Sequence, residues 1–346
     1  MKKVLRLFII LLLIFITIGC VSNPVKNVDE IKIGIVETTG DKYKSSIQWY
    51  NENLEVVDVQ KLKYASLGNT FVQPLYYEDE IYLIPEGIFK TRDTKKIISI
   101  NKKSFNLTEY DVDNIALQSI AINNDFIYVN SNINYETFIN QINRSSKETQ
   151  ETAYPDAYFS TIVAAMDKVF LIGAKEDNLT TSYIYVVDKE LNDIDRIDIS
   201  EYGNGIFKFL VDKDYLYLSV NHTLSNELVS LILKVNIDTH KLEVIDLGVN
   251  FPDTMVSYKE KIFIAHNDIV TQEGTVLSIL DKATNTLETK NLNTDLAYMD
   301  VIDNFLVVAD ENKITLFDID ADFEFVKKVM INKKKDNYIS TLIIID

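Results

Sequence analysis

The chain contains few of the residues that build disulfide scaffolds, metal centres or linkers. Its 346 residues include one Cys, three His, 10 Gly and 5 Pro. A single Cys excludes a disulfide framework and any paired-cysteine zinc or redox site. The low Gly and Pro content, beside 47% hydrophobic residues, excludes collagen-like and disordered chains. We therefore expect a folded chain with a large core.

Common catalytic signatures are also missing. The sequence contains no HExxH, GxSxG or GxGxxG motif and no Walker loop, which excludes the usual zinc peptidase, serine hydrolase and nucleotide-binding patterns. No Ser or Thr stands near a convincing pair of His and acid. We therefore assign no catalytic residue, no metal ligand and no cofactor from the sequence.

Positive charge is scarce as well. The chain has 35 Lys and Arg against 52 Asp and Glu, a net charge of −17. An acidic surface repels phosphate backbones, so nucleic acid is not expected as a partner. The excess acid also serves solubility outside the cell, and we favour that interpretation over an acidic binding function.

The first twenty residues have the pattern of a secretory signal. Lys2, Lys3 and Arg6 precede an apolar run over 7–18, and Gly19-Cys20 follows it. The run is shorter than the roughly 20 residues that a membrane span needs. An ordinary signal with an incidental Cys is the alternative that this pattern leaves open.

Thr17-Ile18-Gly19-Cys20 resembles the lipobox of bacterial lipoproteins. The resemblance implies a signal peptide over 1–19, an acylated Cys20, and a tether over 20–29. Removal of 1–19 leaves 32 basic against 52 acidic side chains, a net charge of −20. The expected location is the cell membrane, lipid-anchored and facing outside the cytoplasm, because several acyl chains anchor a protein stably.

The rest of the chain repeats a strand pattern. An aliphatic–aromatic–aliphatic triplet or a close variant recurs at intervals of 42–47 residues, and we place a seventh copy without an aromatic at 31–33. The triplets begin at Ile81, Ile127, Val169, Leu216, Ile262 and Leu306. Alternating β-branched and aromatic residues between them, with no helical period, indicate strands throughout.

A second marker recurs independently of the first. An Asn or Asp ends one strand of each unit and is expected to open a tight turn, because its side chain accepts a hydrogen bond from the backbone two residues on. These residues are Asn51, Asn101, Asn143, Asp188, Asp238, Asp281 and Asp320.

Four strands in each unit of about 40–45 residues is the spacing of a β-propeller. The chain resembles the seven-bladed propellers of the broad YVTN/WD40-like group, although it has no Gly-His or Trp-Asp dipeptides. The expected fold is all-β, a single seven-bladed β-propeller over 30–346. The last strand, 338–346, matches the first strand of a blade, and 31–36 matches the second. We therefore predict that the C-terminal strand joins the N-terminal blade and closes the ring.

One polar residue in each innermost strand is expected to line the axial channel. These residues are Gln73, Ser119, Thr161, Lys208, Thr254, Tyr298 and Thr341. A water-filled channel that needs polar walls explains most of them. Lys208 is the only positive charge of the set and is the candidate for holding an anionic group.

Loops on one face supply a second candidate group. His222 and His266 fall in the second-to-third strand connections of neighbouring blades, two positions out of register, and could lie on one face of the ring within reach of a shared ligand. Catalysis or metal binding there would need partners such as Asp268 or Glu176.

Two functions remain open at this stage. The favoured one is a binding or scaffold module for a protein, peptide or glycan outside the cell, attached to the membrane through lipid on Cys20. The alternative is a propeller enzyme of lactonase or lyase type that acts at the mouth of the axial channel.

Overall fold

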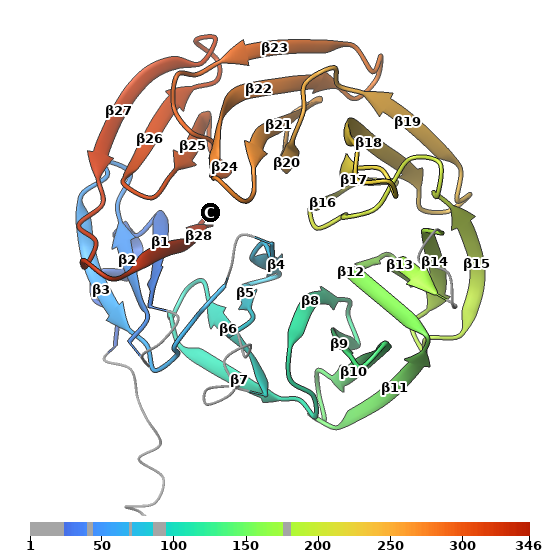
Figure 1. The fold of residues 1–346 in the computed structure, drawn as a ribbon. Coiled ribbons are helices and arrows are strands. Elements are labelled where there is room, and N and C mark those ends of the chain that lie inside the picture. Colours follow the sequence, from blue (N-terminus) through green and yellow to red (C-terminus); the bar gives the residue numbers. More distant parts are fainter. Residues whose placement is uncertain (1–23, 40–43, 69–70, 86–94, 176–180) are drawn as a thin grey trace, which may run out of the picture.

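A computed structural model describes residues 24–39, 44–68, 71–85, 95–175 and 181–346. Their strands form seven four-stranded antiparallel sheets arranged as blades around one axis (Figure 1). The only helix in these ranges is the one-turn 3₁₀ helix η1 (Val28–Glu30). The prediction of an all-β, seven-bladed propeller is confirmed.

Blades 1 to 4 contain the first fifteen strands and the last one. Blade 1 is β28 (Tyr338–Ile344), β1 (Ile33–Thr38), β2 (Ser46–Tyr50) and β3 (Val56–Lys61); blade 2 is β4 (Leu75–Tyr77), β5 (Glu80–Leu83), β6 (Lys96–Asn101) and β7 (Leu107–Asp111); blade 3 is β8 (Leu117–Ile122), β9 (Phe126–Ile133), β10 (Glu136–Asn143) and β11 (Thr149–Pro155); blade 4 is β12 (Ala157–Ala165), β13 (Lys168–Lys175), β14 (Tyr183–Asp188) and β15 (Asp193–Asp198).

Blades 5 to 7 continue the same order from the axis outward. Blade 5 is β16 (Phe209–Asp212), β17 (Tyr215–His222), β18 (Leu228–Asn236) and β19 (Leu242–Asp246); blade 6 is β20 (Pro252–Tyr258), β21 (Lys261–Asp268), β22 (Glu273–Asp281) and β23 (Leu287–Asn291); blade 7 is β24 (Tyr298–Ile302), β25 (Phe305–Ala309), β26 (Lys313–Asp318) and β27 (Glu324–Met330).

The two ends of the fold meet in blade 1. β28 pairs antiparallel with β1, with Ile33 opposite Ile344 and Gly34 opposite Ile343. The C-terminus therefore lies beside the axis (Figure 1). This pairing confirms the predicted closure of the ring. Each innermost strand in the described ranges is therefore paired within a four-stranded sheet.

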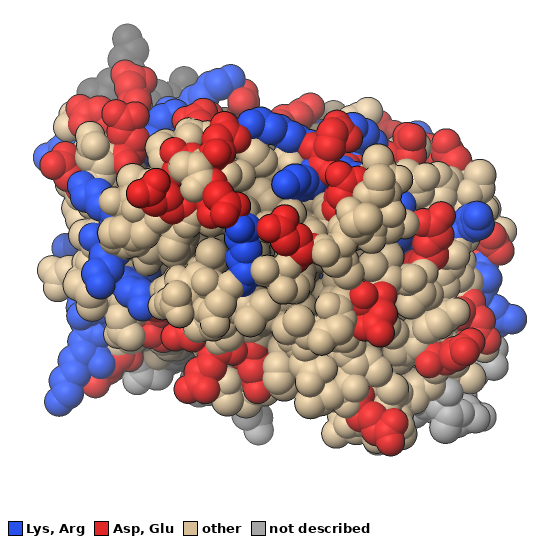
Figure 2. Space-filling view, turned by 90° about the horizontal axis from the view of Figure 1, so that it is seen from above, with Lys and Arg blue, Asp and Glu red and all other residues tan. Residues whose placement is uncertain are grey.

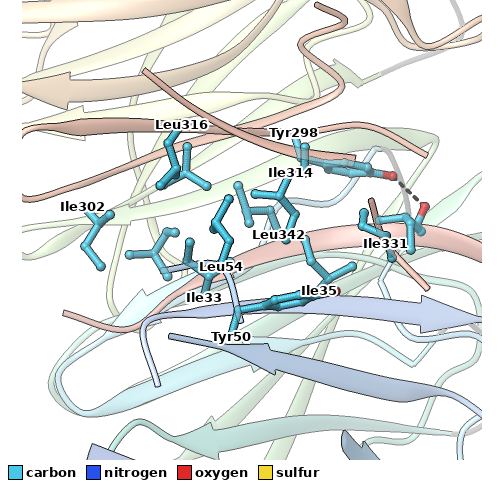
Figure 3. Packing of buried hydrophobic residues seen from close by; sticks show 14 of the residues in the cluster. Ile33, Ile35, Tyr50, Leu54, Tyr298, Ile302, Ile314, Leu316, Ile331 and Leu342 are labelled. Carbon is cyan, nitrogen blue, oxygen red and sulfur yellow. Dashed lines mark hydrogen bonds between the residues drawn. The ribbon is translucent and has the colours of Figure 1, made fainter. Parts of the chain in front are cut away.

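Apolar side chains fill the spaces between neighbouring blades. Figure 3 shows one such cluster, in which Ile33 and Ile35 of blade 1 pack with Ile314 and Leu316 of blade 7. The central aromatics of the repeated triplets, such as Tyr82 and Phe263, are buried in equivalent clusters. Each blade is therefore stabilised through its neighbours, as expected for sheets too small to bury both faces alone.

The register corrects the seventh triplet by two residues. Glu80 pairs with the turn residue Asn101 just before the Ile81 triplet, and the backbone amide of Lys32 bonds to Tyr50, just before Asn51. The triplet of blade 1 is therefore 33–35, with Gly34 in the aromatic position. The prediction at 31–33 was wrong because Ile31 is also buried and imitates the pattern.

Four of the seven predicted turn residues accept the expected hydrogen bond from the amide two residues on, namely Asn101, Asn143, Asp188 and Asp281, and Asn51 accepts one from the amide of Glu55, four residues on. Asn101 Oδ1, for example, accepts hydrogen bonds from the amides of Lys103 and Ser104. In blades 5 and 7 the prediction was two residues late. There Asn236 and Asp318 accept the bonds, from the amides of 239 and 321 respectively, rather than Asp238 and Asp320.

Acidic and basic side chains are interspersed over the rim of the propeller (Figure 2). None of the helical structure in the described ranges has the length and apolar character of a membrane span. Val25 and Val28 pack partly buried against the apolar cluster between blades 1 and 2. The predicted signal peptide over 1–19 and Cys20 lie outside the described residues.

Candidate functional site in the axial cavity

The strand register places the predicted axial residues at one level of the ring. Ser119 lies opposite Asn130, Thr161 opposite Ile172, Tyr298 opposite Ala309, and Thr341 opposite Val36. Each partner is the fourth residue counted from the start of its triplet. The backbone carbonyl of Lys208 accepts a bond from the amide of Ser219, the corresponding residue of blade 5.

Contacts between blades 2 and 5 cross the axis. Gln73 Nε2 donates a hydrogen bond of 3.0 Å to the carbonyl oxygen of Phe209. The rings of Phe71 and Phe207 meet edge to face, with centroids 5.2 Å apart. Blades 3 and 4 separate these two blades along the ring. The crossing contacts therefore narrow the axis on that side.

The axis is divided into two spaces of very different size. The larger is an open cavity of about 770 Å³, within the range of small-molecule sites. The smaller holds about 10 Å³, room for roughly one water molecule. Of the predicted axial residues, Gln73, Lys208, Thr254, Tyr298 and Thr341 line the cavity, whereas Ser119 and Thr161 line the small space with Gln73.

Most of these polar side chains are used to join blades. Ser119 Oγ and the backbone of Ile162 are linked at 3.2–3.3 Å, and Thr161 Oγ1 donates to the carbonyl of Ile206 at 2.6 Å. Tyr298 donates from its hydroxyl to the carbonyl of Ile339 at 2.9 Å (Figure 3). Hydrogen bonds within the fold therefore account for these residues without a ligand.

Lys208 differs from the other members of the ring. Its side chain is 5% exposed and lines the cavity. Its Nζ makes no hydrogen bond or ion pair within 4.0 Å with any residue that the structure describes. A buried ammonium without a counter-charge is costly, and such groups are normally paired. Lys208 is therefore the residue of this level that the fold itself does not explain.

Asp253 is the acid whose charge acts on Lys208. It is 2% exposed, and its Oδ2 accepts a bond from Thr254 Oγ1 at 3.2 Å. Burial lowers the pKa of Lys208, and the Asp253 charge opposes this change only in part. Burial likewise raises the pKa of Asp253 against the influence of Lys208. Burial is the larger cause of both shifts, and no ion pair within 4.0 Å joins the two side chains.

A second charged group faces the same cavity. Asp300, two residues after Tyr298 on β24, is half-buried, and its Oδ1 accepts a bond from the amide of Val301 at 2.8 Å. Burial raises its pKa to about 7, and the nearby Asp346 contributes to the increase. The hydroxyl of Tyr76 also interacts with this carboxyl and accepts a bond from the amide of Ile344 at 2.9 Å.

Sequence reasoning missed Asp300, Asp346 and Tyr76. One signal was present for Asp300: the pleat directs residues two apart to the same side of a strand. Gln73, Lys208 and Thr254 are followed at that interval by Leu75, Leu210 and Val256, so an acid at 300 breaks an apolar pattern.

Two of the candidate face residues, His266 and Asp268, have local structural partners. Of the two ring nitrogens of His266, Nδ1 donates to the carbonyl of Asn250 at 2.9 Å, and Nε2 lies 2.7 Å from Ser278 Oγ. Burial also lowers the pKa of His266, which favours the neutral ring. Asp268 Oδ1 accepts a bond from the amide of Val270 within its own turn. His222 ends β17 half-buried, and Glu176 lies outside the described residues.

These contacts leave no assembled metal or catalytic cluster at the face. Within the described ranges, no group of three or more His, Cys, Asp or Glu side chains is arranged to hold a metal ion. The axial cavity is therefore the better candidate site, because Lys208 and Asp300, neither in an ion pair with a described residue, line one space of suitable size.

Comparisons with known proteins concern the fold. No protein-family model matches the chain, and no curated protein matches it in sequence. The structure is similar to apo AztD from Citrobacter koseri, with a TM-score of 0.52 and 11% identity over 90% of this chain and 98% of that one. It is also similar to a functionally unknown protein from Desulfotomaculum acetoxidans, with a TM-score of 0.57 and 10% identity over 88% and 100% of the two chains.

A third similar structure is the dihydro-heme d1 dehydrogenase NirN in complex with DHE. Its TM-score is 0.55, with 12% identity over 92% of this chain and 77% of that one. Identities this low support the shared propeller architecture and carry no assignment of activity.

Proposed function

We propose that the chain is a lipid-anchored, extracytoplasmic binding protein whose axial cavity takes a carboxylate-bearing part of a peptide or glycan. The observation that carries this proposal is Lys208. It is a buried lysine that lines an open cavity of about 770 Å³, and its Nζ has no hydrogen bond or ion pair within 4.0 Å among the described residues. An anionic group from a ligand would add to the partial compensation by Asp253 and favour the charged form of Lys208, and charge-assisted hydrogen bonds are the strong ones.

Binding is favoured over catalysis by the chemistry of the cavity wall. Among the described lining residues, Lys208 is the only basic side chain, and Asp300 and Asp346 are the only acids. No His or Cys joins them. The wall otherwise consists of backbone, apolar side chains and a few hydroxyls and amides, which suits recognition.

One observation supports the alternative of a lactonase or lyase. An acid with a pKa of about 7, such as Asp300, is suited to proton transfer at neutral pH. Hydrolysis of a lactone panel tests this class directly. Turnover that is lost in both Lys208→Met and Asp300→Asn variants would replace the binding proposal by an enzymatic one.

The binding proposal is tested by calorimetric titration of the full-length chain with trileucine and trigalacturonate, two carboxylate-bearing probes. Binding of either probe is expected to weaken at least about tenfold in Lys208→Met, because a charged hydrogen bond contributes about 1.5–3 kcal/mol. Lys213→Met is the matched control, since Lys213 is an exposed residue paired with Glu260 at 3.4 Å. Equal affinities for wild type and Lys208→Met would contradict the proposal.

The lipid anchor is tested separately. Replacement Cys20→Ser is expected to abolish incorporation of labelled palmitate and to release the chain from the membrane fraction. A Cys20→Ser variant that stays membrane-bound and labelled would contradict the anchor and leave the cavity proposal intact.

A further inference from the structure

We propose that the ligand of the axial cavity is a short peptide with free ends, whose carboxylate is held by Lys208 and whose ammonium is held by Asp300 and Asp346. This inference rests on the proposed function and specifies its ligand. It is carried by the distribution of charge and apolar surface around the cavity wall.

The charged groups occupy one arc of the ring. Lys208 belongs to blade 5, Asp300 to blade 7, and Asp346 follows β28 in blade 1, next along the ring. Blade 6 separates Lys208 from Asp300, and no ion pair within 4.0 Å joins any two of these three side chains. The cavity therefore presents one positive and one negative pole that do not neutralise each other directly.

The negative pole is suited to an ammonium group. The Asp346 charge is close enough to Asp300 to raise the pKa of the Asp300 carboxyl, so the two acids repel each other when both are ionised. Neither forms an ion pair with a described Lys, Arg or His. A cation between them would remove this repulsion and would favour ionisation of Asp300. An ammonium also carries three donors for the carboxylate oxygens.

The acids alone would not define a site, but Lys208 supplies an independent indication. Lys208 is only 5% exposed and lines the same cavity. Its Nζ makes no hydrogen bond or ion pair with a residue in the described ranges. A ligand that carried only a cation would leave Lys208 unpaired, and one that carried only an anion would leave the acids unrelieved. A zwitterion satisfies both poles.

The remaining wall favours a peptide over an acidic sugar. Blades 3 and 4 line the cavity mainly with apolar residues, namely Ala121, Ile122, Val163, Ala165 and Met166, beside Asn123 and Asn124. Met166 is 51% exposed, so it is the part of this surface most open to a ligand. An apolar peptide side chain would bury Met166, whereas the hydroxyls of an acidic sugar would find polar side chains on this wall only at Asn123 and Asn124, among the described residues. The volume of about 770 Å³ is also larger than a single amino acid requires.

Chemical blocking of each peptide end provides the test. The full-length chain is titrated with trileucine, N-acetyl-trileucine and trileucine amide, and with trigalacturonate as the glycan probe. We expect trileucine to bind, and either blocked form to bind at least about tenfold more weakly, since each loses one charged hydrogen-bonded contact.

The variants assign each end of the peptide to one pole. Lys208→Met is expected to bind trileucine and its amide equally, because it no longer recognises the carboxylate. Asp300→Asn is expected to bind trileucine and its N-acetyl form within about threefold of each other. Lys213→Met and Asp303→Asn, at exposed positions, are the matched controls and should retain the wild-type preferences.

Three results would overturn the inference, and they separate it from the proposed function. If N-acetyl-trileucine binds as well as trileucine and binding still depends on Lys208, the anionic site stands and the ammonium site fails. If only trigalacturonate binds, in a Lys208-dependent manner, the ligand is a glycan and the peptide assignment fails. If no probe binds, both this inference and the proposed function fail.

Discussion

Repeated sequence positions build both the spaces between the blades and the axis of the ring. The two regions differ in how far neighbouring side chains compensate for a residue that departs from the repeat. Between blades, one exception is Gly34, which occupies the position of a buried aromatic. Its partner across the strand pair is Trp49, which is fully buried and fills the space instead. At the axis, the exceptions are Lys208 and Asp300, and neither forms an ion pair within 4.0 Å with a described residue. The Asp253 charge offsets the burial of Lys208 only in part, and the Tyr76 hydroxyl offsets that of Asp300 only in part. An exception that the fold compensates is structural, whereas one that it compensates only in part marks a candidate site.

The largest effect on stability is expected at Gly34, the exception for which Trp49 compensates. A Cβ added at Gly34 would lie 2.4 Å from Trp49 Cζ3 and 2.7 Å from Cε3. Gly34→Ala is therefore expected to destabilise the chain by about 3 kcal/mol, the upper end for an overpacked core. The midpoint of chemical denaturation measures this change.

A double variant shows whether the indole ring is the cause. Trp49→Leu alone leaves a cavity and should cost about 3 kcal/mol. Combined with Gly34→Ala, it should cost clearly less than the sum, because the clash is gone. Strict additivity of the two changes would show that Trp49 does not compensate for the glycine.

The sequence was sufficient to predict most of the fold because the repeat is redundant. Two independent markers, the triplet and the Asx turn, recur in the blades and predict the ring and its closure. The errors of two residues at 31–33, Asp238 and Asp320 have one cause. Strand periodicity places residues two apart in equivalent environments, so only pairing across strands fixes the register.

The candidate site was only partly predictable for a different reason. Strand alignment identified Lys208 as the single positive charge of the axial level, and the structure places it in the cavity. The contacts of Phe71 and Gln73 across the axis, which help to shape the cavity, join segments over 130 residues apart. No local pattern carries such information. Asp300 broke an apolar pattern, but one exception in one strand is not distinctive without the cavity around it.

The second-largest effect on stability is expected at Asp300, and it depends on pH. Its folded-state pKa of about 7 lies above the ordinary value of 3.8, so the folded chain keeps a proton that the unfolded chain releases. Stability must therefore fall as pH rises from about 4 to 7. The full linkage value is roughly 4 kcal/mol, and we expect about half of it because the carboxyl faces an open cavity.

Comparison with Asp300→Asn isolates this contribution. The variant should be about 2 kcal/mol more stable than wild type at pH 8 and equally stable near pH 4, as measured by denaturation midpoints across that range. Asp303→Asn, in the exposed turn that follows β24, is the control and should follow the wild-type curve. A constant difference between Asp300→Asn and wild type at all pH values would show that its carboxyl is not desolvated.

The smallest effect on stability is expected at Ser119, an axial residue whose polar side chain is explained by hydrogen bonds within the fold. Ser119 Oγ both donates to the carbonyl of Ile162 and accepts from its amide, joining blades 3 and 4. Ser119→Ala is expected to cost about 1 kcal/mol, the usual net value of such a hydrogen bond. Binding of any cavity ligand should stay unchanged, because Ser119 lines the small space beside Phe71 and Phe207 rather than the cavity. The opposite pattern, unchanged stability with lost binding, would mean that the ligand reaches past the crossing contacts. The distinction between explained and unexplained positions at this level would then be wrong.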